Sequence, residues 1–546
     1  MKLQIFIYYF TICQILLPYI RADLPVHCLK SQTHGKWKFD FTEPKGVSAL
    51  ENRCEHDVPD LEKTSFKAME KTFNSAFSIS LRLLPNGCVE YLESSEKSHF
   101  FRFNLRRKSV TNSTSCTSGL SAAWTMVYDE GFEIRYRELK MFTFSFYSPS
   151  VSGRYESNCA KTCVGWYRNT KTNAMGCFRG EMLEKNAKIS YINDQTDQLN
   201  VVEGVVEQKQ SKPIFKTKRT PRFKSLTQSK FGEKLQLSAN FKEHVKIVNR
   251  LNSISKSHWV ADENSPFKDM SIRELNRLAG KSRNKEKISS NSRRNDNKIQ
   301  YKKAKKVDVS DLPKSLNWEK YLPEPGQQGS CGSCYAISTL KMLESRLKIK
   351  ENINSKISEK HAVECSYYNQ GCEGGYSFLL GRFGEEQGFI DQSCTYTKNA
   401  NEACEHQCGV YKIKDYWYIG GSYGECDERK IMEEIMKNGP VVLSFEPDYT
   451  FMLYKTGIYH KPGINSYVSH DEQKPEWYKV DHSVLCYGWG EENGEKYWLL
   501  MNSWGKIWGE NGMFKMRRGQ DELGIEFIGE AAIPYSVKGG GTNQKT

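Results

Sequence analysis

The chain has very little continuous hydrophobicity. Beyond the stretch from Leu3 to Ile20, none of its 546 residues lies in an apolar run long enough to span a bilayer. It also has no internal repeats and no paired Cys-x-x-Cys units at zinc-finger spacing, so we expect no metal site. Hydrophobic residues still make up 38% of the chain, which excludes global disorder, and the length favours two or three folded units.

The first apolar run has the features of a secretory signal peptide. Lys2 gives it a positive start and the small residue Ala22 ends it, so we expect cleavage after Ala22. A transmembrane anchor is the alternative, but Pro18 interrupts the run and Arg21 follows it directly. We therefore expect no membrane anchor, and a lysosome, a lysosome-like vesicle or the cell exterior as the destination. The 17 cysteines suggest disulfides in that setting.

The net charge of +14 is unevenly distributed. Residues 201–310 contain 27 Lys and Arg against 11 Asp and Glu, so the positive excess lies in this one segment and the sequence after it is mildly acidic. A folded nucleic-acid-binding face would show a different distribution. We therefore expect no nucleic-acid partner.

The sequence divides into a signal peptide (1–22) and three further parts, 23–200, 201–311 and 312–546. Runs such as 77–84 and 141–147 alternate apolar and polar residues between turns, which predicts an all-β domain for 23–200.

Helical spacing recurs in the other two parts. In the basic part 201–311, apolar residues from Phe241 to Ile254 predict an amphipathic helix before Trp259, and a shorter helix is expected over 271–278. The part 312–546 shows a helical pattern from Cys334 to about Lys348. It continues with strand-like runs over 483–487 and 497–501, so the fold class is α+β.

One string suggests nucleophilic catalysis. Cys334 follows Gln328-Gly-Ser-Cys-Gly-Ser and opens a helix, whose macrodipole lowers the pKa of a thiol at its N-terminus. His482 is the candidate base and Asn502 can orient its ring through an amide oxygen. Gln328 can donate an N–H to an oxyanion. The alternatives are a structural disulfide at Cys334 and a structural histidine at His482.

These motifs resemble the papain family of cysteine peptidases, and Tyr335 after the nucleophile fits its signature. The resemblance implies a two-lobed catalytic domain with a helical lobe and a β-barrel lobe. It also implies that Gly374, Gly375 and Trp504 bind substrate. The disulfides that it implies are Cys331–Cys372, Cys365–Cys404, Cys394–Cys408, Cys28–Cys159 and Cys54–Cys177.

Further cysteines have no clear partner in that scheme. Cys426 and Cys486 are expected to stay as buried thiols. Pairing Cys88 with Cys116 is a guess that leaves Cys163 odd.

The N-terminal part resembles the exclusion domain of the dipeptidyl peptidase I branch of that family, through segments such as 23–28, 35–37 and 131–134. Such a domain blocks the non-primed end of the cleft. The resemblance implies that the carboxylate of Asp23, the first residue after the expected cleavage, pairs with the free α-amino group of a substrate. An ordinary flexible terminal Asp is the alternative.

The expected function is therefore release of dipeptides from free N-termini of peptides and proteins by thiolate acyl-enzyme catalysis. A papain-like endopeptidase and a non-catalytic binding protein on the same scaffold are the alternatives. The resemblance also implies a homotetramer. It makes residues 201–311 an activation propeptide, held partly by its positive charge, and places a chain cleavage within 460–480, for which an uncut loop is the alternative.

Two smaller expectations complete this set. No cofactor is required, but the branch binds chloride through tyrosine hydroxyls. Tyr423 matches one of them, whereas Phe378 stands at the other position and Tyr376 is a nearby substitute. Asn112 lies in an Asn-Ser-Thr glycosylation sequon that is either occupied or empty.

Overall fold

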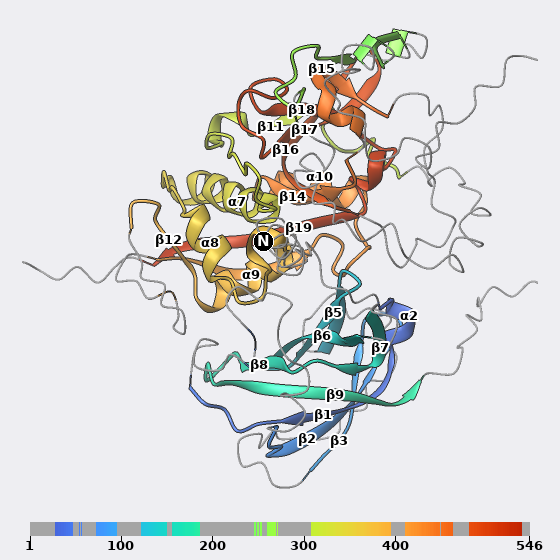
Figure 1. The fold of residues 1–546 in the computed structure, drawn as a ribbon, viewed down its shortest axis with the longest axis vertical. Coiled ribbons are helices and arrows are strands. Elements are labelled where there is room, and N and C mark those ends of the chain that lie inside the picture. Colours follow the sequence, from blue (N-terminus) through green and yellow to red (C-terminus); the bar gives the residue numbers. More distant parts are fainter. Residues whose placement is uncertain are drawn as a thin grey trace, which may run out of the picture.

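The structure is a computed structural model. It describes residues 28–46, 54, 56, 73–95, 122–149, 155–185, 245–246, 248–250, 252–253, 259–268, 270, 307–394, 404, 410–447, 449–461 and 480–537. An all-β unit lies against a larger unit of helices and strands (Figure 1). Within the described ranges no helix is both long and apolar enough to cross a membrane.

The N-terminal β domain is one nine-stranded sheet in the order β3-β2-β1-β9-β7-β6-β5-β4, with β8 pairing β6 and β9. Alternation along β1 buries Trp37, Phe39 and Phe41, as the sequence pattern predicts for strands. Its elements are α2 (Lys30–Thr33), β1 (Gly35–Phe41), β2 (Phe77–Leu83), β3 (Val89–Ser94), β4 (Ala122–Val127), β5 (Gly131–Tyr136), β6 (Leu139–Pro149), β7 (Tyr155–Thr162), β8 (Gly165–Asn169) and β9 (Met175–Lys185).

The larger unit begins with a helical lobe. Its central helix α7 is buried along most of its length and ends at Asn352, which adopts the left-handed conformation with φ 55°. The lobe contains η4 (Glu319–Tyr321), α7 (Cys334–Glu351), α8 (Glu359–Cys365), η5 (Gly371–Glu373) and α9 (Ser377–Glu386).

A second lobe, built on a ten-stranded sheet, packs against α7. The strand order is β10-β15-β18-β17-β16-β14-β19-β13-β12, with β11 pairing β16. The α+β expectation is therefore confirmed. The elements are β10 (Trp259–Ala261), β11 (Leu316–Asn317), β12 (Phe389–Ile390), β13 (Val410–Tyr418), α10 (Glu428–Asn438), β14 (Val441–Phe445), η6 (Tyr449–Leu453), β15 (Tyr454–Tyr459), β16 (His482–Glu492), β17 (Glu495–Met501), β18 (Met513–Arg517), η7 (Glu522–Gly524) and β19 (Ile528–Val537).

Strand β10 belongs to the basic segment 201–311 and pairs with the edge strand β15. Val245 and Val248, on the apolar face of the expected helix, are buried in the same cluster as Trp259. Nearby, Phe267 packs edge-on against Trp504 with ring centroids 5.3 Å apart. The described part of this segment is thus attached by apolar packing. The expected helix over 271–278 lies outside the described residues.

The ion pairs of the described part of this segment differ from our expectation. In the ion pairs of its described residues, the segment supplies the acid: Asp262 to Lys455 at 3.8 Å and Asp311 to Arg429 at 2.7 Å. We expected basic side chains of this segment to pair with acidic groups on the rest of the chain, but the described ion pairs have the opposite polarity. The lysine-rich stretches of the segment lie outside the described residues.

A buried ionic network joins the two units. Glu133 of β5 accepts from Arg382 of α9 at 3.1 Å and from the Tyr416 hydroxyl at 2.6 Å. Arg135 contacts the other Glu133 oxygen at 2.6 Å and donates to the Tyr416 carbonyl at 2.9 Å. Burial alone would raise the pKa of Glu133, but Arg135 and Arg382 outweigh it and lower that pKa to about 2.

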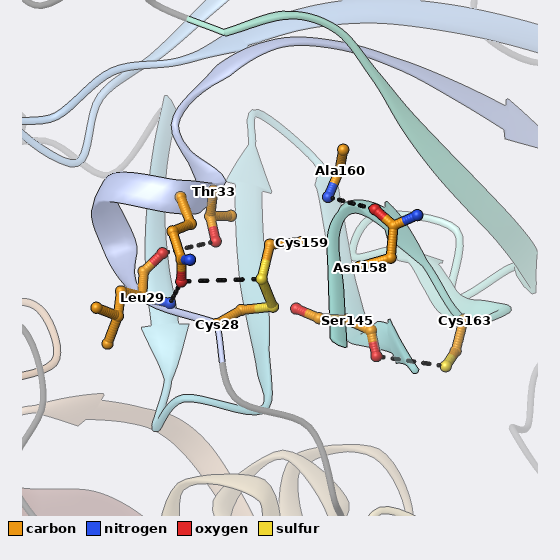
Figure 2. The surroundings of a disulfide bond; sticks show 9 residues. Cys28, Leu29, Thr33, Ser145, Asn158, Cys159, Ala160 and Cys163 are labelled. Atoms are coloured by element: carbon orange, nitrogen blue, oxygen red, sulfur yellow. Dashed lines mark hydrogen bonds between the residues drawn. A yellow bond between two sulfur atoms is a disulfide. The ribbon is translucent and has the colours of Figure 1, made fainter. Parts of the chain in front are cut away.

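Disulfides fix the loops around both units. Figure 2 shows the Cys28–Cys159 bond, which ties the start of the described chain to β7. Cys88 and Cys394 are disulfide-bonded as well, and their expected partners Cys116 and Cys408 lie outside the described residues. The structure also contains three further expected pairs, Cys54–Cys177, Cys331–Cys372 and Cys365–Cys404. Buried thiols remain at Cys163, Cys334, Cys426 and Cys486.

Candidate active site

The nucleophile candidate stands at the N-terminus of the central helix. Cys334 is the first residue of α7, and Ser333 before it has non-helical dihedrals. The loop that leads to it is fixed by the Cys331–Cys372 disulfide and by a 2.8 Å bond from the Gly332 N–H to the Cys372 carbonyl. This loop places the sulfur at the positive end of a long helix dipole, where a thiolate is favoured.

The base and its orienting group come from the sheet lobe. His482 is the first residue of β16, and Asn502 follows the last residue of β17. The two strands are antiparallel neighbours, so the start of β16 and the end of β17 lie at the same edge of the sheet. His482 Nε2 lies 2.8 Å from Asn502 Oδ1. Trp504 lies over the imidazole with ring centroids 4.9 Å apart and shields this hydrogen bond from water. The arrangement fixes the ring with Nδ1 as the nitrogen left for proton exchange.

Cys334 and His482 meet across the two lobes. The backbone N–H of Ser483, the residue after His482, hydrogen-bonds the Cys334 thiol. His482 Nδ1 is buried and accepts no hydrogen bond from the described residues. The sulfur therefore lies beside the start of β16, whose first residue carries a buried basic nitrogen with no hydrogen bond from the described residues, and a Cys–His nucleophile needs such a nitrogen near the thiol.

Burial sets the resting protonation of this pair. It raises the pKa of the Cys334 thiol to about 11 and lowers the pKa of His482 to about 4, because a lone charge is poorly solvated there. The helix dipole alone, on which the sequence argument relied, does not overcome this desolvation. Transfer of the thiol proton to Nδ1 creates two opposite charges that stabilise each other, so the thiolate forms as a pair with the imidazolium.

Gln328 lies beside the nucleophile with both ends of its amide held. Ser503 donates its hydroxyl to Gln328 Oε1 at 2.6 Å, and Gln328 Nε2 donates to the Cys331 carbonyl at 3.0 Å. Oε1 is fixed as the acceptor, so the NH₂ group faces the nucleophile loop. Such a donor can stabilise an oxyanion together with the Cys334 backbone N–H.

The glycines expected to bind substrate flank the same loop. Gly374 has φ 134°, a conformation that favours glycine, and a Cβ at Gly375 would lie 2.6 Å from Asn369 Oδ1. The next residue, Tyr376, packs on Tyr128 of the N-terminal β domain with ring centroids 4.1 Å apart.

Tyr128 is a site residue that sequence reasoning missed. It occupies the β4–β5 turn with φ 53°, and its hydroxyl lies 3.4 Å from Ser444 Oγ, which in turn lies 3.0 Å from Ser483 Oγ. It is also close enough to Cys334 for the two groups to interact electrostatically. The β domain therefore reaches the catalytic pair. Its sequence gives no motif for this; the unusual φ of a tyrosine marks it only in the structure.

Other expected residues stand as follows. Asp23, Asn112 and the cleavage region 462–479 lie outside the described residues. Trp504 is buried beneath Phe267 of the basic segment, so that segment covers it. Tyr423 lies beside Tyr128 with ring centroids 5.4 Å apart. The described residues contain no group of three His, Cys, Asp or Glu that could hold a metal.

This geometry is that of a cysteine peptidase, and family comparison agrees. Residues 312–532, which contain the Cys–His–Asn site, match the family model for papain family cysteine proteases. The chain is therefore a cysteine peptidase whose residues 312–532 match the papain family.

The N-terminal β domain also matches a known family. Residues 23–182 match the cathepsin C exclusion domain. The chain is 26% identical to cathepsin C of Schistosoma mansoni over 93% of this chain and 94% of that protein. It is 25% identical to dipeptidyl aminopeptidase 1 of Plasmodium falciparum (isolate 3D7) over 92% of each. Cathepsin L of Sarcophaga peregrina is 34% identical but matches only 38% of this chain and 60% of that protein. The chain thus combines a papain family peptidase domain with a cathepsin C exclusion domain.

Proposed function

We propose that this cysteine peptidase removes dipeptides from the free N-termini of peptides and proteins. The observation that supports this most directly is a backbone bond at the start of the described chain. The Cys28 N–H donates to the Asp129 carbonyl at 2.6 Å, and Asp129 follows Tyr128, which reaches the catalytic pair. The N-terminal segment is therefore attached next to Tyr128, and in this proposal Tyr128 lies at the non-primed end of the site.

Asp23 is within reach of that end. It precedes Cys28 by five residues, and an extended chain spans about 3.3–3.6 Å per residue, or roughly 17 Å in total. Once the signal peptide is removed, its carboxylate can pair with the α-amino group of a substrate. Such a charge-assisted bond favours a free N-terminus over an internal amide.

The catalytic steps follow from the site. The Cys334 thiolate attacks the carbonyl carbon after the second substrate residue, while Gln328 Nε2 and the Cys334 N–H stabilise the oxyanion. The His482 imidazolium gives its Nδ1 proton to the leaving amine, which leaves a thioester. His482 then takes a proton from water, which attacks the thioester and releases the dipeptide.

Replacement of Asp23 by Asn tests this assignment. We expect kcat/KM for a peptide with a free α-amine to fall about 10- to 100-fold, because a hydrogen bond between charged groups contributes about 1.5–3 kcal/mol. Active-site labelling by a thiol-reactive peptide probe should continue. Asp40→Asn, at a half-buried position of β1 next to Lys38, is the matched control and should change neither value.

Substrates with acetylated N-termini separate the alternatives. If the unaltered enzyme cleaves their internal bonds as fast as it releases dipeptides, it is an endopeptidase and Asp23 has no anchoring role. If the probe labels no Cys334 after maturation, the scaffold is a binding protein.

We also propose that the processed chains form a homotetramer in a lysosome-like compartment, as the family resemblance implies. In this proposal, loss of residues 201–311 uncovers Trp504, on which Phe267 packs. The mass of the purified, processed enzyme under native conditions tests the assembly, and a monomer at working concentration would exclude it.

A further inference from the structure

A buried carboxyl group lies next to the active-site pocket but takes no part in the chemistry. Glu530 of β19 is 3% exposed. Its Oε1 accepts the Phe378 N–H at 3.0 Å and also bonds the Ser377 side chain, at the start of α9. Its other oxygen, Oε2, is buried and has no hydrogen-bond partner among the described residues.

Two tyrosines lie near this carboxyl group. After burial, the charge of Glu530 is the next cause that raises the pKa of both Tyr128 and Tyr418, so it lies close to both rings. Tyr128 also interacts electrostatically with Cys334, so it lies near both Glu530 and the nucleophile. Tyr418 stacks on Phe378 with centroids 4.3 Å apart.

The backbone donors at this place are not available to a chloride ion. The Phe378 N–H is bonded to Glu530 and the Tyr376 N–H to Asn369 Oδ1 at 2.7 Å. Phe378 has no hydroxyl, so the donors left for an anion are tyrosine hydroxyls such as that of Tyr418. The cavity beside Glu530 and Ser377 measures about 10 Å³. This cavity, which neither Tyr376 nor Tyr423 lines, has room for about one water and not for the larger chloride ion.

Charge alone does not exclude chloride, because Glu530 is protonated at mildly acidic pH. Burial raises the pKa of Glu530 to about 8. A chloride ion nearby would raise that pKa further, so it could bind only if the carboxyl group kept its proton. Even then the protonated group would still occupy the space and hold the Phe378 N–H.

We propose that the carboxyl group of Glu530 takes the place of the chloride ion in this chain, so that the pocket beside Cys334 works without chloride. Glu530 is a positioning residue in this proposal. It joins β19 to the first turn of α9 and thereby holds Tyr376 and the preceding glycines of the substrate loop. The proposal rests on the proposed dipeptidyl function only for the choice of substrate.

A chloride series on the processed enzyme tests it. Dipeptide release is measured at an ionic strength of about 0.1 M, with chloride replaced stepwise by the larger gluconate anion. We expect kcat/KM to stay within about twofold over the series. A rise of about fivefold or more with chloride would overturn the proposal.

Two variants probe the same place. Glu530→Ala empties it and frees the Phe378 N–H, so we expect reduced activity in gluconate that chloride partly restores. If this variant folds but loses activity whether or not chloride is present, Glu530 has a purely structural role. That result would contradict the proposal that its carboxyl group replaces chloride. Glu526→Ala, which removes a buried carboxyl group bonded to Trp498 instead, is the matched control and should show no chloride response.

Glu530→Gln is a second test, which still applies if the alanine variant does not fold. Its amide oxygen can still accept the Phe378 N–H and its volume is the same, so we expect it to remain insensitive to chloride. A new chloride requirement in Glu530→Gln would overturn the proposal. If the enzyme instead cleaves only blocked peptides, the dipeptidyl function fails, and the same chloride series on those peptides still decides the role of Glu530.

Discussion

Asp481 precedes His482 in the chain, and its carboxylate acts on both members of the catalytic pair. After the larger effect of burial, its negative charge raises the pKa of His482 by favouring the imidazolium, and raises the pKa of Cys334 by disfavouring the thiolate. One carboxylate thus moves both pKa values in the same direction.

Asp481→Asn should therefore shift the whole pH profile of kcat/KM. Both pKa values fall when the charge is removed, so the acid and the alkaline limbs each move to lower pH, by up to about one unit. Rates measured across the pH range check this. Glu492→Gln, at an exposed position paired with Lys515, is the control. A shift of one limb only would show that Asp481 acts on one group and not on the pair.

Sequence reasoning at this scale applies to residues that stand in local motifs. Cys334, His482 and Asn502 each lie in a short string whose chemistry can be read directly. Tyr128 and Glu530 do not, because their roles depend on long-range contacts. Tyr128 meets Ser444 across 316 positions, and Glu530 meets Phe378 across 152. No local pattern encodes such a contact, so only the folded chain reveals it.

At the scale of elements, the β5 strand and the α9 helix carry the contact between the exclusion domain and the catalytic domain. Glu133 on β5 is fully buried, and its carboxylate accepts hydrogen bonds from Arg382, Arg135 and Tyr416. Removing one partner from such a network leaves charges buried without compensation, whereas an exposed ion pair contributes little.

Glu133→Ala should accordingly loosen the exclusion domain. We expect the free energy of unfolding to fall by about 3 kcal/mol, and cleavage of peptides with blocked N-termini to rise. Denaturant unfolding and an N-acetylated substrate measure the two effects. Asp311→Ala, which breaks the exposed pair with Arg429, should lower the free energy of unfolding far less, because solvent screens an exposed pair. Equal losses in the two variants would mean that the buried network does not hold the domains together.

Element boundaries show how far periodicity can be used. The helical pattern from Cys334 to about Lys348 predicts α7 closely, because one helix carries its own spacing. The run 483–487 underestimates β16, which extends from His482 to Glu492. Two glycines break its apolar pattern, yet a Cβ at Gly488 would lie 2.1 Å from the Leu316 carbonyl, so pairing with β11 requires glycine there. That requirement comes from a partner strand far away in sequence.

At the scale of the whole molecule, buried carboxyl groups set the response of stability to pH. Burial raises the pKa of Glu522 to about 7 and that of Glu526 to about 8. Between the ordinary glutamate pKa and these values, the folded state binds more protons than the unfolded state. Their contribution is therefore complete below about pH 4.5 and is lost as the pH rises through 7 to 8.

Glu133 acts in the opposite direction. Its pKa is lowered to about 2, so its contribution is present above the ordinary glutamate value and is lost only as the pH falls towards 2. The two effects together favour a mildly acidic optimum, in which the domain contact is intact and the buried carboxyl groups are neutral. That optimum suits the proposed lysosome-like compartment.

The melting temperature should therefore fall as the pH rises from about 5 to 8, by roughly 5 °C or more. Glu522→Gln removes one titrating group while keeping an acceptor for the Lys461 N–H, which now lies 3.0 Å from Glu522 Oε1, so this variant should show a shallower fall. Calorimetry across the pH range measures both, with the exposed Glu492→Gln as the control. A melting temperature that rises towards pH 8 would mean that Glu522 and Glu526 are ionised in the folded enzyme, each balanced by the arginines around them.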